Sequence, residues 1–293
     1  MGHLENTSAQ LAWDQPVGPV RIRPLGPHIG AEVRGLDLGH LDDSGVAAIR
    51  DALARHAVLM FPDQTLTPDH LLAFAHHFGE IEHERFIPKL EGHSGVHVLR
   101  GISKTKLTTQ NLIWHVDHSY KEHPLALAAL YAIDVPPAGG DTLFAGMAAA
   151  YDGLSDRMKS YLDGLTAVHD VMAYGLRSGL FNTTDARAAI ARMPPPTEHP
   201  LVCTHPVSGR KMLFVNESWT TSIIGLDPGE SRAILDYLFA HATRPEYQLR
   251  LHWTKGSVCV WDNCAVQHRG IPDYDGLRLM HRIAVTGAWR PGA

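Results

Sequence analysis

The chain contains few cysteines and no long apolar run. Its three cysteines, Cys203, Cys259 and Cys264, form no CxxC pair, which argues against a disulfide framework or a structural zinc knuckle and favours a reducing compartment. No stretch reaches the roughly 18 consecutive apolar residues of a transmembrane helix, and the opening "MGHLENTSAQ" lacks the apolar core of a signal peptide. We therefore expect a cytoplasmic protein with no membrane partner.

An excess of charge of one sign is also missing. The 26 basic and 31 acidic residues give a net charge of −5 with no long run of either sign, so we expect no electrostatic capture of nucleic acid. A small molecule is the expected partner. Hydrophobic residues make up 44% of the chain and charged residues 19%, which is typical of a globular protein with a substantial core.

The order of the predicted elements favours a mainly β fold with helical cover, of the α+β class. Residues 20–38 are typical of a strand pair, and after about residue 95 short strand-like runs dominate. Helical patterns cover the ranges 42–56, 67–79, 145–165 and 227–243. Many short strands with a few inserted helices predict a β-sandwich or jelly roll and not a βαβ alternation.

Two segments differ from the rest of the chain. Residues 1–18 are polar and Pro-rich, which predicts a flexible N-terminal tail ahead of a single domain over 19–293. Residues 172–198 have weak periodicity and a Pro-rich end. We expect this second segment to form a mobile lid or a long crossover within the domain.

The stretch "WHVDHSY" (114–120) offers the first candidate metal ligands. On an extended segment residues i and i+2 share a face, so His115 and Asp117 project together while His118 points away. A non-haem Fe(II) site needs two histidines and one carboxylate on one face, which leaves open positions for substrate and O2. A second, distant histidine is therefore required, and His268 in "VWDNCAVQHRG" is the candidate.

A pair of arginines near the C-terminus suggests an anionic ligand. In "GLRLMHR", Arg278 and Arg282 lie an even number of residues apart on a predicted strand, so both side chains would face the same interior. Buried guanidinium groups are costly unless each meets an anion, and their forked geometry suits carboxylate, sulfonate or phosphate.

The motifs "WHVD", "GGDTLF", "THPVSGRKMLFVNE", "WDNCAVQHRG" and "RLMHR", in this order, resemble those of the taurine dioxygenase / 2,4-D dioxygenase (TauD/TfdA) family of Fe(II)- and 2-oxoglutarate-dependent enzymes. The resemblance runs from about residue 20 to 290. It implies a clavaminate synthase-like double-stranded β-helix, or jelly roll, with Fe(II) held by the catalytic residues His115, Asp117 and His268. It also implies that Thr142 and Arg278 bind the distal carboxylate of 2-oxoglutarate.

The resemblance also suggests residues that bind the primary substrate. Arg282 would hold an anionic group, and Asn111 and His83 occupy or neighbour the positions of sulfonate-binding residues in taurine-specific members. Trp219 and Val171 stand where those members have phenylalanine, so the pocket is reshaped. The exact substrate therefore stays open among taurine-like sulfonates, alkyl sulfates and aryloxyalkanoates.

The implied activity uses O2 and 2-oxoglutarate to hydroxylate a small anionic substrate next to a heteroatom, giving succinate, CO2 and a cleaved product. The resemblance also implies that the protein is a homodimer or a homotetramer. Two other classes stay open: a non-oxidative, cupin-like isomerase or hydrolase on the same scaffold, and a silent binding protein. Purely structural roles are the competing interpretation for each site residue. Asp262 and Asn263 are natural turn residues, and we assign them to packing.

Overall fold

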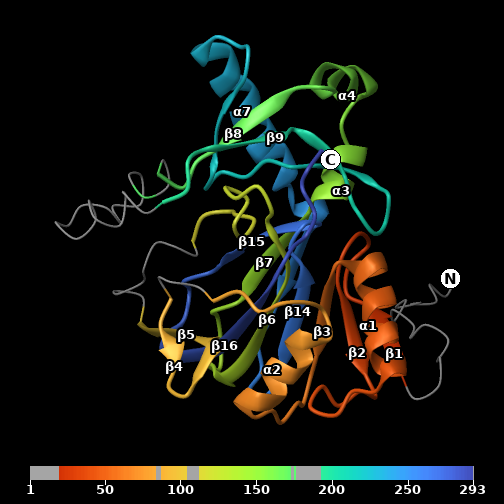
Figure 1. Ribbon diagram of the computed structural model, residues 1–293, viewed down its shortest axis with the longest axis vertical. Helices are drawn as coiled ribbons and strands as arrows, with labels where there is room; N and C mark the ends of the chain where they lie inside the picture. The colour runs from red at the N-terminus through yellow and green to blue at the C-terminus, as the bar shows by residue number, and fades with distance from the viewer. Residues whose placement is uncertain (1–19, 84–86, 104–111, 173–174, 176–192, 293) are drawn as a thin grey trace, which may run out of the picture.

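The computed structural model describes residues 20–83, 87–103, 112–172, 175 and 193–292 of the chain (Figure 1). The predicted tail over 1–18 lies outside this part, as does most of the predicted lid over 172–198. Among the described residues, no helix combines the length and apolarity that crossing a membrane requires.

A large, mostly antiparallel sheet forms the centre of the fold. Its eight strands run in the order β1-β2-β3-β14-β6-β16-β5-β4, and only the β2–β3 pair is parallel. In that order the strands are Arg21–Pro24, Ala31–Arg34, Val58–Phe61, Val258–Asp262, Leu125–Asp134, Asp275–Thr286, His93–Ser103 and Lys89–Leu90. Strand β14, from near the C-terminus, thus pairs with β3 from the first quarter of the chain.

A second sheet of three strands packs against this one. It contains β13 (Gln248–Leu251), β7 (Thr142–Gly146) and β15 (Val266–Gly270), with β7 in the middle. The Phe144 ring of β7 meets the Trp261 ring of β14 edge-on, with 5.6 Å between centroids. Both side chains are fully buried. Burial of side chains of this size stabilises a fold by about 1.5–3 kcal/mol each, so this contact holds the two sheets together.

Two helices, α1 (Asp43–His56) and α2 (Pro68–His76), cover the other face of the large sheet (Figure 1). The Asp42 side chain caps α1 by accepting from the Gly45 N–H, and Thr67 forms a capping box at the start of α2. Their apolar faces share one buried cluster with alternate residues of β3, Leu59 and Phe61. Both helices and the mainly β fold confirm the prediction.

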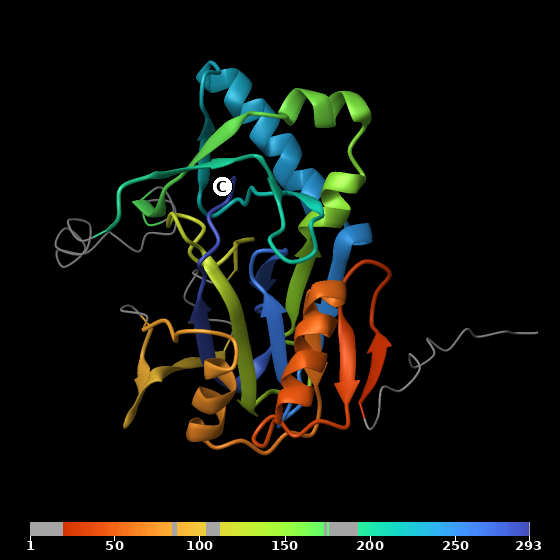
Figure 2. The same cartoon turned by 45° about the vertical axis from the view of Figure 1, so that its right-hand side comes forward.

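The remaining elements form a separate layer at one end of the two sheets (Figure 2). They are α3 (Met147–Asp152), α4 (Asp156–Leu162), β8 (Thr166–His169), β9 (Thr197–Pro200), β10 (Val202–Thr204), β11 (Lys211–Leu213), β12 (Thr220–Ile223), α7 (Pro228–Ala242) and the 3-10 turn η2 (Pro245–Tyr247). The predicted helical pattern over 145–165 forms two helices, because Ser155 caps a new start at α4. Strand β9 begins inside the range predicted as a lid.

Candidate metal centre

Two main-chain hydrogen bonds bring the distant histidines together. The His115 N–H donates to the His268 carbonyl at 3.1 Å, and the His268 N–H donates to the His115 carbonyl at 2.8 Å. This isolated bridge joins the segment before Asp117 to the edge of β15. Directly opposed residues in such a bridge lie close together, so the imidazoles of His115 and His268 extend from neighbouring points of the main chain.

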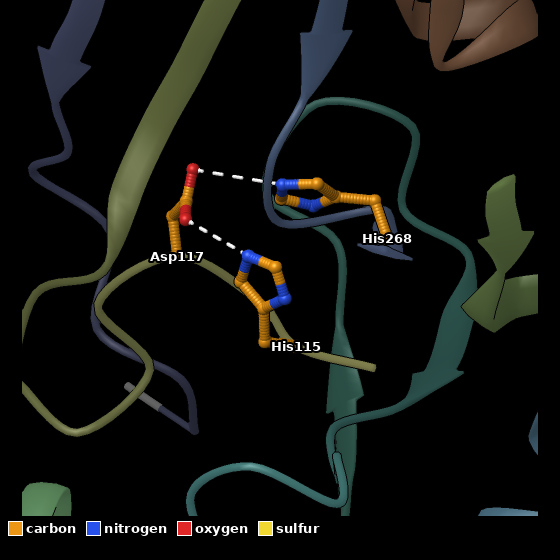
Figure 3. A group of neighbouring side chains, drawn as sticks. All are labelled: His115, Asp117 and His268. Carbon is orange, nitrogen blue, oxygen red and sulfur yellow. Dashed lines mark ion pairs between the residues drawn. The ribbon is translucent and has the colours of Figure 1, made fainter. Parts of the chain in front are cut away.

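Figure 3 shows the two imidazoles and the Asp117 carboxylate pointing into one shared space. The nearest ligand atoms of the three residues all lie within 4.8 Å of one another. His115 Nε2 is 3.5 Å from Asp117 Oδ1, and His268 Nε2 is 3.9 Å from Asp117 Oδ2. Two imidazoles and one carboxylate on a single face match the donor set that non-haem Fe(II) prefers.

The hydrogen bonding of His115 gives it the tautomer that a metal ligand needs. Its Nδ1 lies 2.8 Å from the carbonyl oxygen of Ile113, which can only accept, so Nδ1 carries the proton. The lone pair of Nε2 then faces Asp117, as in metal-ligating histidines whose other nitrogen donates to the main chain. Burial, together with the nearby His115, lowers the pKa of His268 to about 3, so the His268 ring is neutral near pH 7.

Arg282 keeps Asp117 ionised. Burial by itself would raise the pKa of Asp117, but the positive charge of the nearby Arg282 guanidinium opposes burial most strongly, so this pKa lies well below its usual range. The Arg282 Nη2 donates to Asp117 Oδ2 at 2.9 Å, and Arg282 is only 5% exposed. The residue predicted to hold the substrate anion thus contacts a candidate metal ligand directly.

Thr142 and Arg278 converge on the indole of Trp253. The Trp253 Nε1–H donates to Thr142 Oγ1 at 3.0 Å, which leaves the Thr142 hydroxyl hydrogen available to another acceptor. The Arg278 guanidinium lies 5.8 Å from the centre of the same indole, and its Nε donates to the Gly140 carbonyl at 3.0 Å. Sequence reasoning did not identify Trp253, whose only signal is its place at the end of a strand-like run.

A cavity opens beside Arg278. Among the residues that line it are Gly101, Gly140 and Tyr274. Burial lowers the pKa of Arg278, while the nearby Tyr274 and Asp141 raise it. A guanidinium remains charged in proteins, so a half-buried one at a cavity favours an anionic ligand there.

Gly101 leaves room for Tyr274, and this supplies a test of the cavity. A Cβ at Gly101 would collide with the Tyr274 hydroxyl, whereas the ring carbon Cζ would lie 3.2 Å away. Gly101→Ala is expected to displace Tyr274 and to lower the Tm, since such overpacking costs about 1–3 kcal/mol of stability. The displaced ring changes the cavity wall, so 2-oxoglutarate binding is expected to weaken about tenfold, which corresponds to about 1.4 kcal/mol. Adding Tyr274→Phe should restore most of the affinity. Isothermal titration checks both, and a double variant no better than Gly101→Ala would contradict the argument.

The other predicted substrate residues are placed as follows. Asn111 lies outside the described residues. His83 is exposed, with Nδ1 3.3 Å from the Ser94 carbonyl oxygen. Trp219 is half-buried, and its Nε1–H donates to the Val116 carbonyl at 3.0 Å, while Val171 is buried. Their roles toward a substrate stay predictions.

Comparison with known proteins identifies the family. The family model described as "Taurine catabolism dioxygenase TauD, TfdA family" matches residues 21–284. The chain belongs to this family. A crystal structure of a taurine dioxygenase from Burkholderia xenovorans is 36% identical, with a TM-score of 0.78 over 93% of this chain and 91% of that one. The predicted TauD/TfdA membership is therefore confirmed.

Two TauD/TfdA relatives illustrate the range of named activities. The alpha-ketoglutarate-dependent 2,4-dichlorophenoxyacetate dioxygenase of Cupriavidus pinatubonensis is 35% identical over 269 residues, which cover 86% of this chain and 92% of that protein. The alpha-ketoglutarate-dependent sulfate ester dioxygenase of Pseudomonas putida is 32% identical over 289 residues, covering 96% of this chain and 94% of that protein. Both relatives are matched over nearly their whole length.

Proposed function

We propose that His115, Asp117 and His268 hold Fe(II) in this chain, which is a 2-oxoglutarate-dependent dioxygenase of the TauD/TfdA family, and that it hydroxylates a small anionic substrate next to a heteroatom. The observation that carries the proposal is the buried cluster of two imidazoles and one carboxylate, with ligand atoms within 4.8 Å of one another. Relatives named as sulfonate, sulfate ester and 2,4-dichlorophenoxyacetate dioxygenases support the substrate class.

Each residue of the site has a separate task in this proposal. When bound, Fe(II) and 2-oxoglutarate use O2 to convert one substrate C–H bond to C–OH, with release of succinate and CO2. Arg278 and Thr142 hold the distal carboxylate of the cosubstrate, one by charge and one by its hydroxyl. Arg282 orients the anionic end of the substrate so that one C–H bond faces the metal. A hydroxylated carbon that bears S, O or N then collapses to a carbonyl and releases that group.

The finer structural predictions belong to the same proposal. The two packed sheets are the two halves of a double-stranded β-helix, and residues 19–293 form one domain, which the family match over 21–284 supports. The three cysteines are buried and free, which supports a reducing cytoplasm. We also propose a homodimer or homotetramer, and light scattering after size exclusion measures it.

A panel of anions tests the substrate class. Taurine, hexyl sulfate and 2,4-dichlorophenoxyacetate are incubated separately with protein, Fe(II), 2-oxoglutarate and O2, and succinate is quantified. One class is expected to raise succinate formation about tenfold or more above the level without substrate, and the matching product, sulfite, sulfate or phenol, identifies it. Failure of all three would contradict an anionic substrate of these kinds.

Thr142→Val tests the hydroxyl contact with the cosubstrate. Valine has the same shape but removes the hydroxyl, so the KM for 2-oxoglutarate is expected to rise about tenfold, the worth of one hydrogen bond to a charged group. The Trp253 N–H, buried with Thr142, also loses its acceptor, so the Tm should fall. Thr142→Ser keeps the hydroxyl and is the matched control. Equal KM values for wild type, Thr142→Val and Thr142→Ser would show that the Thr142 hydroxyl does not bind 2-oxoglutarate.

A further inference from the structure

Asn263, in the turn between β14 and β15, directs its whole side chain at the main chain around Asp117. Its Oδ1 accepts from the Asp117 N–H at 3.0 Å, and its Nδ2 donates to the carbonyl oxygens of Asp117 and Leu125, both at 2.9 Å. Asn263 is fully buried. A buried amide with both ends satisfied by one residue of the metal loop is more specific than turn packing requires.

The peptide group that joins Val116 to Asp117 is held at both of its ends. The Asn263 Oδ1 binds its N–H, and the Trp219 Nε1–H binds its carbonyl at 3.0 Å. These contacts come from two different parts of the chain. Together they fix the orientation of the peptide plane, and with it the direction in which the Asp117 side chain leaves the backbone.

The backbone after Asp117 adopts an unfavourable conformation that needs such support. His118 has a φ of 57°, in the left-handed region, which costs a residue with a side chain about 1–2 kcal/mol. Residues 117–120 form a turn immediately beyond the carboxylate, with the Lys121 N–H donating to the His118 carbonyl at 2.9 Å. The hydrogen bond from Asn263 to the Asp117 carbonyl anchors the peptide that enters this turn.

We propose that Asn263 is a positioning residue for the metal: it acts through the main chain of Asp117, sets the direction of the carboxylate and so raises metal affinity without touching the metal. The proposal rests on the assignment of Asp117 as a ligand. It adds a second role to the turn packing that the sequence predicts for Asn263. Partners that orient metal ligands typically account for about 10–100-fold in metal affinity.

Mn(II) binding to the metal-free protein tests the proposal without any need for a substrate. Free Mn(II) is measured by electron paramagnetic resonance during titration of wild type, Asn263→Ala and Asp262→Asn. Asn263→Ala should raise the Kd about 10–100-fold. Asp262→Asn is the matched control, because the Asp262 side chain caps the same turn at Cys264 and Ala265 and does not contact Asp117. Its Kd should stay within about threefold of wild type.

Two results would overturn the proposal: a wild-type Kd for Asn263→Ala, or an equal loss in Asp262→Asn, which would assign the effect to the turn. If Asn263→Ala does not fold, Asn263→Ser is measured in its place with the same criteria. Asp117→Ala in the same titration separates the hypothesis of a metal site at Asp117 from the hypothesis that Asn263 positions Asp117. Loss of Mn(II) binding in Asp117→Ala without loss in Asn263→Ala defeats only the positioning role, whereas wild-type binding in Asp117→Ala defeats the metal site itself.

Discussion

Asp117→Ala is expected to abolish metal binding and turnover together. The substitution removes one of the three proposed metal ligands and the single negative charge among them, so the Kd for Mn(II) should rise at least about 100-fold and succinate formation should fall to background. Arg282, which is almost fully buried, also loses its hydrogen bond to a carboxylate. Removal of one partner of such a buried pair destabilises proteins by about 3–5 kcal/mol, so the Tm should fall as well.

Asp117→Asn separates the loss of metal binding from the loss of stability. An asparagine keeps the shape of the side chain and an oxygen that can accept from Arg282, so it should recover part of the Tm while metal binding stays lost. Calorimetry and Mn(II) titration of both variants check this. A silent binding protein would keep its affinity for anionic ligands in Asp117→Ala. Turnover that persists in either variant would remove Asp117 from the reaction.

Arg278→Gln is expected to raise the Kd for 2-oxoglutarate about 100-fold while leaving the Kd for Mn(II) unchanged. In the proposed complex, 2-oxoglutarate covers the half-buried Arg278 guanidinium. Loss of one partner from such a covered, hydrogen-bonded charge pair costs about 2–5 kcal/mol, and glutamine supplies no charge to the distal carboxylate. Arg278 faces the cavity from β16, and its described contacts are with Gly140 and the Trp253 ring. The substitution should therefore weaken the binding of 2-oxoglutarate and leave the binding of the metal unchanged.

Arg100 provides a matched control for Arg278. It lines the same cavity, but it is exposed to solvent. Exposed ion pairs contribute about 0–1 kcal/mol, so Arg100→Gln should change the Kd for 2-oxoglutarate no more than about fivefold. If both variants lost affinity equally, the summed positive charge around the cavity, and not a specific contact of Arg278, would account for cosubstrate binding. If neither did, Arg278 would have no role as a carboxylate anchor.

Local patterns predicted the parts of the fold that depend on neighbouring residues. The helix after Asp42 and the helix after Thr67 form where capping residues and apolar spacing place them, because these signals act within one or two turns. The spacing of His115 and Asp117 likewise placed both side chains on one side of the chain. The strand predicted to carry Arg278 and Arg282 is present as β16.

Contacts between distant segments escaped prediction from local patterns. Strand β15 carries His268 in "VQHRG", which has too few apolar residues to signal a strand, and it forms because β7 pairs with it. Two hydrogen bonds to Asp117 join positions far apart in the chain. One comes from the Arg282 side chain, and the other joins the Asp117 N–H to the Asn263 side chain. Asparagine in a turn is common, so its sequence position gives no signal of a role at the metal.

Anaerobic titration of Fe(II) and 2-oxoglutarate into the metal-free protein tests the central claim most directly. If His115, Asp117 and His268 hold Fe(II) while Arg278 and Thr142 hold the cosubstrate, a weak visible charge-transfer band should appear only when both are present. The band should be absent in Asp117→Ala and should need far more 2-oxoglutarate in Arg278→Gln. Iron-loaded wild-type protein that gives no band at saturating 2-oxoglutarate would contradict the account.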